Sequence, residues 1–248
     1  GLGTQHLEVA LAKLKNKFGV EITLENPRVP YRESIRKSCK AQGRHKKQTG
    51  GHGQFGDVWI QFEPIEGEGI EFAENVFGGS VPKNFFPAVE KGIAESVKKG
   101  PLAAYPVTGI KAVLYDGSYH PVDSSEMAFK VATQQAFKKG IMEAKPVLLE
   151  PIATLKVVVP EGYTGDVMGE LNKRRARVMG MNPTDNGYQE IVADIPYLEL
   201  YGYNATLRSM TSGSGTFSYE FARYEQAPDD VAAKQIEERA SKLVEVEE

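Results

Sequence analysis

The sequence has almost no cysteine and no long apolar run. Its single cysteine, Cys39, excludes an intramolecular disulfide framework and is typical of a reducing cytoplasm. No apolar run approaches the about 20 residues that cross a membrane, and no signal-peptide pattern opens the chain. The phosphate-binding motif Gly-x-x-x-x-Gly-Lys-Ser/Thr is also missing. We therefore expect a cytoplasmic protein, without membrane contact and without a nucleotide-binding loop of this kind.

Acidic residues are missing from one stretch of the chain. No Asp or Glu lies between Glu33 and Asp57. The basic residues of this stretch are Arg36, Lys37, Lys40, Arg44, Lys46 and Lys47. Because the formal net charge of the chain is −3, they make a local positive field on an acidic protein.

A glycine-rich loop lies at the centre of this basic stretch. Apolar side chains alternate with polar ones before it, up to Cys39, and again after it, from Phe55 to Phe62. This period of two predicts a long β-hairpin. The glycines Gly50, Gly51, Gly53 and Gly56 allow positive φ and a close approach of another polymer to the main chain.

Neutral side chains complete the loop. Gln48, Thr49, His52 and Gln54 supply hydrogen-bond donors and acceptors, while the strands below supply positive charge. This combination suits an RNA surface. The alternative is a disordered glycine loop whose lysines only keep the protein soluble.

The unit that contains this loop, residues 26–149, predicts an α+β fold. A strand is expected near residues 70–76, a helix at 83–98 and a strand at 107–115. A turn at 116–120 then leads to a helix that opens at Asp123-Ser124-Ser125-Glu126, which resembles a capping box, and ends at Gly140. With both helices on one face of the strands, the glycine loop and this turn lie at one end of the unit.

The next unit, residues 150–226, predicts the order β-α-β-β-α-β, with Asn186-Gly187 as the turn of a hairpin. This order is the split βαβ, or ferredoxin-like, arrangement. Its basic cluster consists of Lys173, Arg174, Arg175 and Arg177, for which a solvated helix end is the commoner explanation. Residues 227–248 predict an amphipathic helix with an acidic end.

The first residues predict one helix, with Leu7, Leu11, Leu14 and Phe18 on one face, and then a strand in which Val20, Ile22 and Leu24 alternate. One helix and one strand cannot bury both of their apolar faces alone. We therefore expect residues 1–25 to be the remnant of a preceding domain.

Several stretches resemble translation elongation factor G in order and spacing. Residues 1–8 (Gly-Leu-Gly-Thr-Gln-His-Leu-Glu) resemble the end of its third domain. Residues 48–56 (Gln-Thr-Gly-Gly-His-Gly-Gln-Phe-Gly) and 115–130, which begin Tyr-Asp-Gly-Ser-Tyr-His, resemble two loops and a helix of its fourth. Residues 165–175, 195–203 and 207–218 resemble its fifth. The resemblance covers essentially the whole chain.

The resemblance implies a fold and a function. Residues 26–149 would form domain IV, an elongated arm with a fold like that of ribosomal protein S5, and residues 150–226 a ferredoxin-like domain V. The arm would reach the decoding centre, where the tRNA–mRNA complex meets 16S rRNA, and domain V would contact 23S rRNA. GTP and Mg²⁺ would bind a separate N-terminal domain, so this chain alone would hold no cofactor and no metal and would have no enzymatic activity. The chain is expected to be a monomer.

The resemblance also assigns residues to the ribosome-contacting tip, with His120 at the place of the family's functional histidine. The tip residues are Gln48, Thr49, Gly50, Gly51, His52, Gly53, Gln54, Gly117, Ser118, Tyr119 and His120. The supporting basic residues are Arg44, Lys46, Lys47, Lys173, Arg174 and Arg175.

Three positions depart from elongation factor G. The family usually has Arg where His52 stands, an acidic residue where Pro121 stands, and Arg where Ser214 stands. Replacing Arg by His or Ser removes a permanent guanidinium from an RNA contact. These changes indicate an elongation-factor-G-like paralogue, for which ribosome recycling, back-translocation or tetracycline-type ribosome protection are open alternatives to translocation.

Two further hypotheses come from the residues. The chain could be a free-standing RNA-binding module without a GTPase. Alternatively, His45, His52, Cys39 and Asp57 could form a metal or hydrolytic site, but no ligand spacing supports this.

Overall fold

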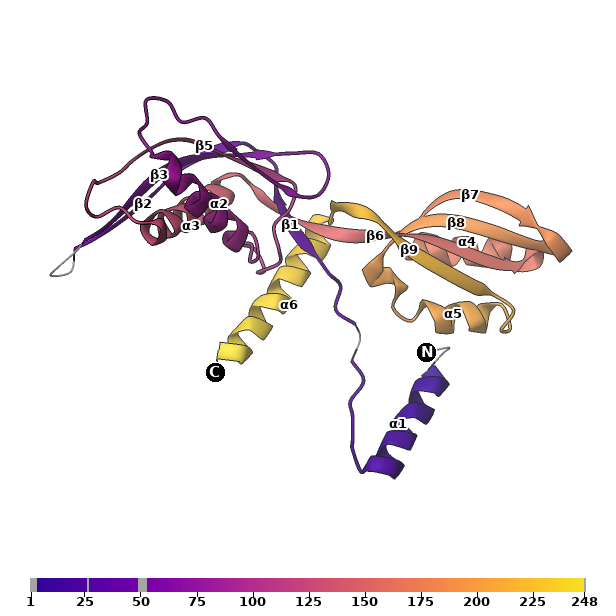
Figure 1. Cartoon of the computed structure of the whole chain (residues 1–248). Helices are drawn as coiled ribbons and strands as arrows, with labels where there is room; N and C mark the ends of the chain where they lie inside the picture. Colours follow the sequence, from indigo (N-terminus) through magenta and orange to yellow (C-terminus); the bar gives the residue numbers. More distant parts are fainter. Residues whose placement is uncertain (1–3, 26, 49–52, 248) are drawn as a thin grey trace. The chain divides into compact units, whose positions relative to one another are not determined.

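A computed structural model describes residues 4–25, 27–48 and 53–247 (Figure 1). The chain forms two compact units. We call Tyr31–Leu149 with Gln226–Glu248 the glycine-loop unit, and Gly1–Pro30 with Glu150–Glu225 the ferredoxin-like unit. None of the helices in the described part of the chain has the length and apolar character that a membrane span needs.

The glycine-loop unit is built on a four-stranded sheet in the order β2-β3-β5-β4. Its elements are β1 (Arg32–Ile35), β2 (Cys39–Lys47), β3 (Gln54–Pro64), β4 (Ile70–Glu74), the 3₁₀ helix η1 (Lys83–Phe85), α2 (Phe86–Ser96), β5 (Ile110–Ser118), α3 (Glu126–Glu143) and α6 (Asp229–Glu247). The strands β2 and β3 are antiparallel, as the predicted hairpin requires, whereas β4 runs parallel to β5.

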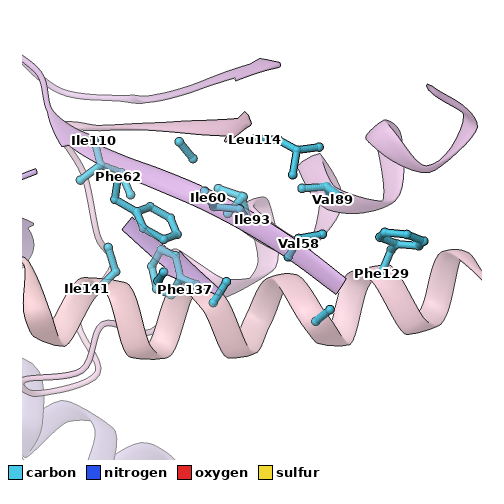
Figure 2. Close-up of a cluster of buried hydrophobic side chains, with 14 of the residues drawn as sticks. Val58, Ile60, Phe62, Val89, Ile93, Ile110, Leu114, Phe129, Phe137 and Ile141 are labelled. Atoms are coloured by element: carbon cyan, nitrogen blue, oxygen red, sulfur yellow. The ribbon is translucent and has the colours of Figure 1, made fainter. Parts of the chain in front are cut away.

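Alternation along β3 decides which face of this sheet is buried. Val58, Ile60 and Phe62 are fully buried, and the residues between them are more exposed. Figure 2 shows these three side chains beside Phe137 of α3 and Val89 of α2. The two helices therefore cover one face of the sheet and form the core of the unit with it (Figure 1).

Two glycines let the hairpin lie directly on α3. A Cβ at Gly43 would collide with the backbone oxygen of Ala132, and a Cβ at Gly56 would come 2.5 Å from the backbone oxygen of Ala128. Neither Gly53 nor Gly56 has a positive φ. The sequence interpretation of Gly53 and Gly56 as sources of positive φ was therefore wrong. Their missing side chains allow close packing instead.

The ferredoxin-like unit has the predicted order β-α-β-β-α-β. Its elements are α1 (Thr4–Phe18), β6 (Pro146–Pro160), η2 (Glu161–Tyr163), α4 (Thr164–Lys173), β7 (Arg177–Thr184), η3 (Asp185–Gly187), β8 (Tyr188–Pro196), η4 (Tyr197–Leu200), α5 (Tyr203–Met210) and β9 (Thr216–Gln226). The first residues of β6 belong to the glycine-loop unit, where they pair with β1. The remainder of β6 lies between β8 and β9. The α+β fold class is confirmed in both units.

Alternating residues of β6 and β8 build the core of the ferredoxin-like unit. Leu155 and Val157 of β6 and Ile191 of β8 are fully buried and pack with α4 and α5, through Leu171 and Leu207. The turn between β7 and β8 has positive φ at Asn186 (63°) and Gly187 (74°). The Asn-Gly signal in the sequence therefore identified this hairpin correctly.

Three predicted elements differ from the structure. The strand β5 continues to Ser118, so most of the turn predicted at 116–120 is strand. Residues 20–24 form no strand, and Val20, Ile22 and Leu24 are about half exposed, because no described strand pairs with them. The second helix of the predicted β-α-β-β-α-β order, which the sequence pattern extends from Leu198 to Met210, is interrupted in the structure, since Gly202 adopts a left-handed conformation with φ of 72° between η4 and α5.

Candidate nucleic-acid interface

The end of the β2–β3 hairpin and the loop between β5 and α3 lie in contact. The backbone N–H of Gly53 donates a hydrogen bond to Oδ1 of Asp123 (3.0 Å), and the backbone N–H of Phe55 donates to the carbonyl oxygen of Asp123 (2.8 Å). A Cβ at Gly53 would come 2.8 Å from the Asp123 carboxyl group. Asp123 therefore joins the two loops that the sequence placed at one end of the unit.

The predicted tip residues Thr49, Gly50, Gly51 and His52 lie outside the described residues. Of the others, Gln48, Gln54, Tyr119 and His120 are exposed, whereas Gly53, Gly117 and Ser118 are half-buried. The exposed side chains are free to meet a partner, while the half-buried residues hold the two loops in place.

The loop that carries His120 closes on itself. The backbone N–H of His120 donates to Oγ of Ser124 (2.9 Å), and the N–H of Ser124 donates to the carbonyl oxygen of His120 (3.1 Å). The next serine, Ser125, is the N-cap of α3, with its Oγ accepting from the N–H of Ala128 (3.2 Å). The capping signal in the sequence thus located the helix start, but it did not show that Asp123 bonds to the hairpin.

The contacts of His120 fix which ring nitrogen can donate. Nδ1 accepts from the backbone N–H groups of Val122 (3.3 Å) and Asp123 (3.1 Å). It also lies 3.4 Å from Oδ2 of Asp123, an ion pair that exists only when the ring is protonated. Because backbone N–H groups can only donate, the neutral ring carries its proton on Nε2. The half-exposed side chain thus keeps one N–H donor for a partner, and its ring lies 6.4 Å from that of Phe55.

A buried carboxylate supports both loops from below. Asp57 of β3 is 7% exposed and accepts hydrogen bonds from Nε2 of Gln42 (2.8 Å) and Oγ of Ser118 (2.7 Å). It therefore joins β2 to the end of β5. The alternation of the sequence places Asp57 on the same face as Phe55 and Trp59, but no signal in the sequence distinguishes it from a solvated residue.

The basic residues of the hairpin remain exposed. Arg44, Lys46 and Lys47 of β2 are exposed, and the guanidinium carbon of Arg44 lies 5.7 Å from the centre of the Phe55 ring. His45, between them, contacts Oε1 of Gln54 through Nε2 (2.8 Å). The hairpin thus presents positive charge beside the tip, as a phosphate-binding surface requires.

The second basic cluster is divided by the structure. Lys173 is exposed, but Arg174 donates to the carbonyl oxygens of Glu199 (2.7 Å) and Tyr201 (3.1 Å) and pairs with Glu170 (2.7 Å). Arg175 makes two parallel bonds of 2.9 Å to the buried carboxylate of Glu150. The hydrogen bonds of Arg175 to Glu150 and, secondarily, to Glu199 raise the pKa of its guanidinium further above its usual range. Both arginines are tied to their own unit, so only Lys173 remains open to a partner.

The residues of the hypothetical metal site serve other contacts. The Cys39 thiol donates to the carbonyl oxygen of Gly140 (3.0 Å), and burial raises its pKa. Asp57 is occupied by Gln42 and Ser118, and His52 is outside the described residues. In the part of the chain that the structure describes, no three His, Cys, Asp or Glu residues gather as metal ligands would.

Comparison with known proteins assigns both units to one family. Residues 27–145 match the family model of elongation factor G, domain IV, and residues 147–235 match that of the elongation factor G C-terminus. The chain belongs to the elongation factor G family. An elongation factor G-like protein of Thermotoga maritima is 49% identical over all 248 residues of this chain. A crystal structure of a protein from Thermus thermophilus is 44% identical, covers 96% of the chain and superposes with a TM-score of 0.88.

The chain spans about 36% of the length of each of these two proteins. It therefore corresponds to the last two domains of an elongation factor G-like protein. The domain IV match includes both loops of the tip, and the C-terminal match includes the ferredoxin-like unit.

Proposed function

We propose that this chain is the ribosome-contacting arm of a ribosome-dependent GTPase that promotes movement of the tRNA–mRNA complex. The hairpin end and the His120 loop would enter the decoding centre, against 16S rRNA, and the ferredoxin-like unit would contact 23S rRNA. The parent protein would act in the cytoplasm as a monomer. GTP and Mg²⁺ would bind a domain that precedes this chain.

One observation carries the proposal: Asp123 binds Gly53 and Phe55 of the hairpin from within the His120 loop. This contact makes a single tip of two loops. The tip has exposed neutral donors at Gln48 and His120 and exposed cations beside it. Neutral donors read the shape of an RNA and cations hold its phosphates, so the tip has the parts that an RNA contact needs.

The tip requires no covalent chemistry. By occupying space that a moving tRNA has just left, it would prevent the tRNA from returning, and GTP turnover elsewhere in the protein would supply the energy. The Nε2–H of His120 can donate to a base or phosphate oxygen, and its ring can stack on a base. The loop beneath it, closed by the hydrogen bonds between His120 and Ser124, would hold this side chain in position.

A second candidate is an elongation-factor-G-like paralogue that acts in ribosome recycling, back-translocation or tetracycline-type protection. The relative from Thermotoga maritima, which carries the name of an elongation factor G-like protein, favours it. So do His52, Pro121 and Ser214, which replace residues that the translocase usually has. Both candidates use the same tip and differ in the step of translation that the parent protein serves.

Ribosome pelleting tests the shared part of both candidates. Replacing Arg44, Lys46 and Lys47 by Gln should reduce cosedimentation of the chain with ribosomes, because three phosphate contacts are lost, and the reduction should be greatest at low salt. The matched control replaces three exposed lysines of the helices α2 and α3, Lys91, Lys138 and Lys139, by Gln. If the first variant pellets as well as the control, the hairpin cations serve only solubility.

A nucleotide assay separates this proposal from one in which the chain is itself a GTPase. The purified chain should neither bind nor hydrolyse GTP, since it has no Gly-x-x-x-x-Gly-Lys-Ser/Thr motif. GTP hydrolysis that co-purifies with the chain and survives further purification would contradict this. The native gene tests the alternative of a free-standing RNA-binding module. A GTPase domain encoded upstream of this chain would exclude that alternative, and the absence of one would support it.

A further inference from the structure

The sheet of the glycine-loop unit has a second face, opposite α2 and α3. Because Val58 and Ile60 point to the helices, the odd-numbered residues of β3 lie on the opposite face. The same holds for the even-numbered residues of β2, since Ala41 is buried and Gly43 adjoins α3. In Figure 1, both helices lie on one side of the sheet. We call the opposite side the open face; its described residues are half-buried or exposed, apart from Asp57.

Three aromatic side chains lie on the open face, and all are half-buried: Phe55, Trp59 and Tyr115. The rings of Trp59 and Tyr115 are 6.4 Å apart at an angle of 53°. Alternation along β5 places Tyr115 on this face, because Ile110, Ala112 and Leu114 are buried on the other. A register shift between β3 and β5 at Trp59 adds one residue to β5 there, so Asp116 lies opposite Trp59, beside Tyr115.

Cations flank the rings. The Lys40 ammonium lies 5.1 Å from the centre of the Tyr115 ring, and the Arg44 guanidinium lies 5.7 Å from that of Phe55. Lys40, Arg44 and Lys46 are all exposed on the same face of β2. One strand therefore presents positive charge along its length, and the next presents aromatic surface.

Acidic residues of the open face lie on β3, β4 and β5 rather than on β2. The carboxylate of Asp57 is held by Gln42 and Ser118. At the far end of the sheet, Glu63 accepts from Nε2 of Gln61 (2.5 Å), and Glu71 of β4 lies 4.0 Å from the Lys111 ammonium. Asp116 of β5 is exposed opposite Trp59 and accepts from the N–H of Gly117 (2.8 Å). The β2 side of the open face is thus positive, which favours a polyanion over an acidic or apolar protein segment.

We infer that the open face is a second RNA-binding surface, on which bases stack on Trp59 and Tyr115 while Lys40 and Arg44 hold the adjoining phosphates. Aromatic rings on a sheet beside a positive strand bind single-stranded RNA with little sequence preference, because every base has a face that can stack. The surface is continuous with the tip through Phe55 and Lys46. The inference rests on the proposed function for the identity of its partner, a single-stranded segment of RNA. Its test uses the chain and an RNA oligonucleotide and does not require a ribosome.

Trp59 makes the test direct, because it is the only tryptophan of the chain. A short oligouridine titrated into the chain at low salt should quench the Trp59 fluorescence as it binds. Tyr115→Leu and Lys40→Gln should each weaken binding by about tenfold, through loss of stacking and of a phosphate contact. The matched controls are Tyr219→Leu, an exposed tyrosine of β9, and Lys138→Gln on α3, which should bind like the unaltered chain.

The outcomes distinguish the inference about the open face from the proposed function of the chain. Quenching that both test variants weaken, and neither control weakens, supports the open face. Binding without quenching, or variants that bind as well as their controls, overturns it, and the occupant of this face is then a protein segment or solvent. If the open face fails while the variant of Arg44, Lys46 and Lys47 still loses ribosomes, the proposed function stands without it. If that variant also retains ribosomes, the proposed function fails separately.

Discussion

At the scale of single residues, Glu33 shows how much one buried carboxylate can organise. It is fully buried in β1, and its two oxygens accept from the backbone N–H groups of Leu102 (2.9 Å), Ala103 (2.9 Å) and Tyr105 (3.1 Å). Burial raises its pKa, and the three hydrogen bonds offset part of that rise. The loop after α2 is therefore wrapped around one side chain, and a Cβ at Gly100 would collide with its carboxylate.

Glu33→Gln should lower the free energy of unfolding at neutral pH by about 1–3 kcal/mol, because the amide turns an NH₂ group toward a backbone N–H donor. The raised pKa fixes the direction in which the contribution of Glu33 to stability changes with pH. The folded chain binds the Glu33 proton more tightly than the unfolded chain, so this residue's contribution to stability falls as pH rises from the ordinary Glu value of about 4.3 through the raised value.

Urea unfolding followed by Trp59 fluorescence measures this prediction, since Trp59 lies in the same unit as Glu33. The difference in unfolding free energy between the unaltered chain and Glu33→Gln should become smaller as pH rises above that ordinary value. A difference that grows with pH would show that the hydrogen bonds, rather than burial, dominate the environment of Glu33.

At the scale of elements, the hairpin and the His120 loop are joined through Asp123. Asp123→Ala removes the acceptor for the Gly53 N–H, at a cost of about 1 kcal/mol. The Gly53 amide should then exchange its hydrogen faster, while the core amides of β3 keep their protection. The matched control is Asp116→Ala, since Asp116 bonds only to the N–H of its neighbour Gly117 among the described contacts of its carboxylate.

Hydrogen exchange measured residue by residue decides this prediction. If Gly53 exchanges equally in both variants, the backbone bond from Phe55 to Asp123 is enough to hold the tip, and the side chain of Asp123 has another role.

Periodic patterns predicted most elements of the fold, and contacts between distant residues explain the rest. The hairpin, the Asn186-Gly187 turn and the split βαβ order all follow from local signals. Asp123 belonged to a local capping signal, and only the fold brings it to Gly53, 70 residues away. In the same way, the register shift that places Asp116 opposite Trp59 depends on pairing with β3. Local sequence signals could therefore predict the elements, but not which distant residues the fold brings into contact.

The basic clusters illustrate the same limit. A run of Lys and Arg predicts positive charge, but not whether acidic partners lie nearby in the fold. The hairpin run stays exposed, because no acidic residue lies in the stretch around it. In the ferredoxin-like unit, Glu150 and Glu199 come from elements on either side and engage Arg175.

At the scale of the whole molecule, two units of one family follow each other along the chain. The chain spans about 36% of the length of the two relatives. The proposed function places GTP turnover in a domain outside this chain and the contact with moving tRNA at the tip.

Single-turnover tRNA translocation by the full-length parent protein, intact and with His120→Ala, tests the proposed function of the tip most directly. If the proposed function is correct, the intact protein translocates and the variant is severely slowed while it still hydrolyses GTP on ribosomes. If the intact protein hydrolyses GTP but moves no tRNA, the paralogue candidate replaces the translocase. Equal translocation rates for the intact protein and the variant would contradict the role assigned to the tip.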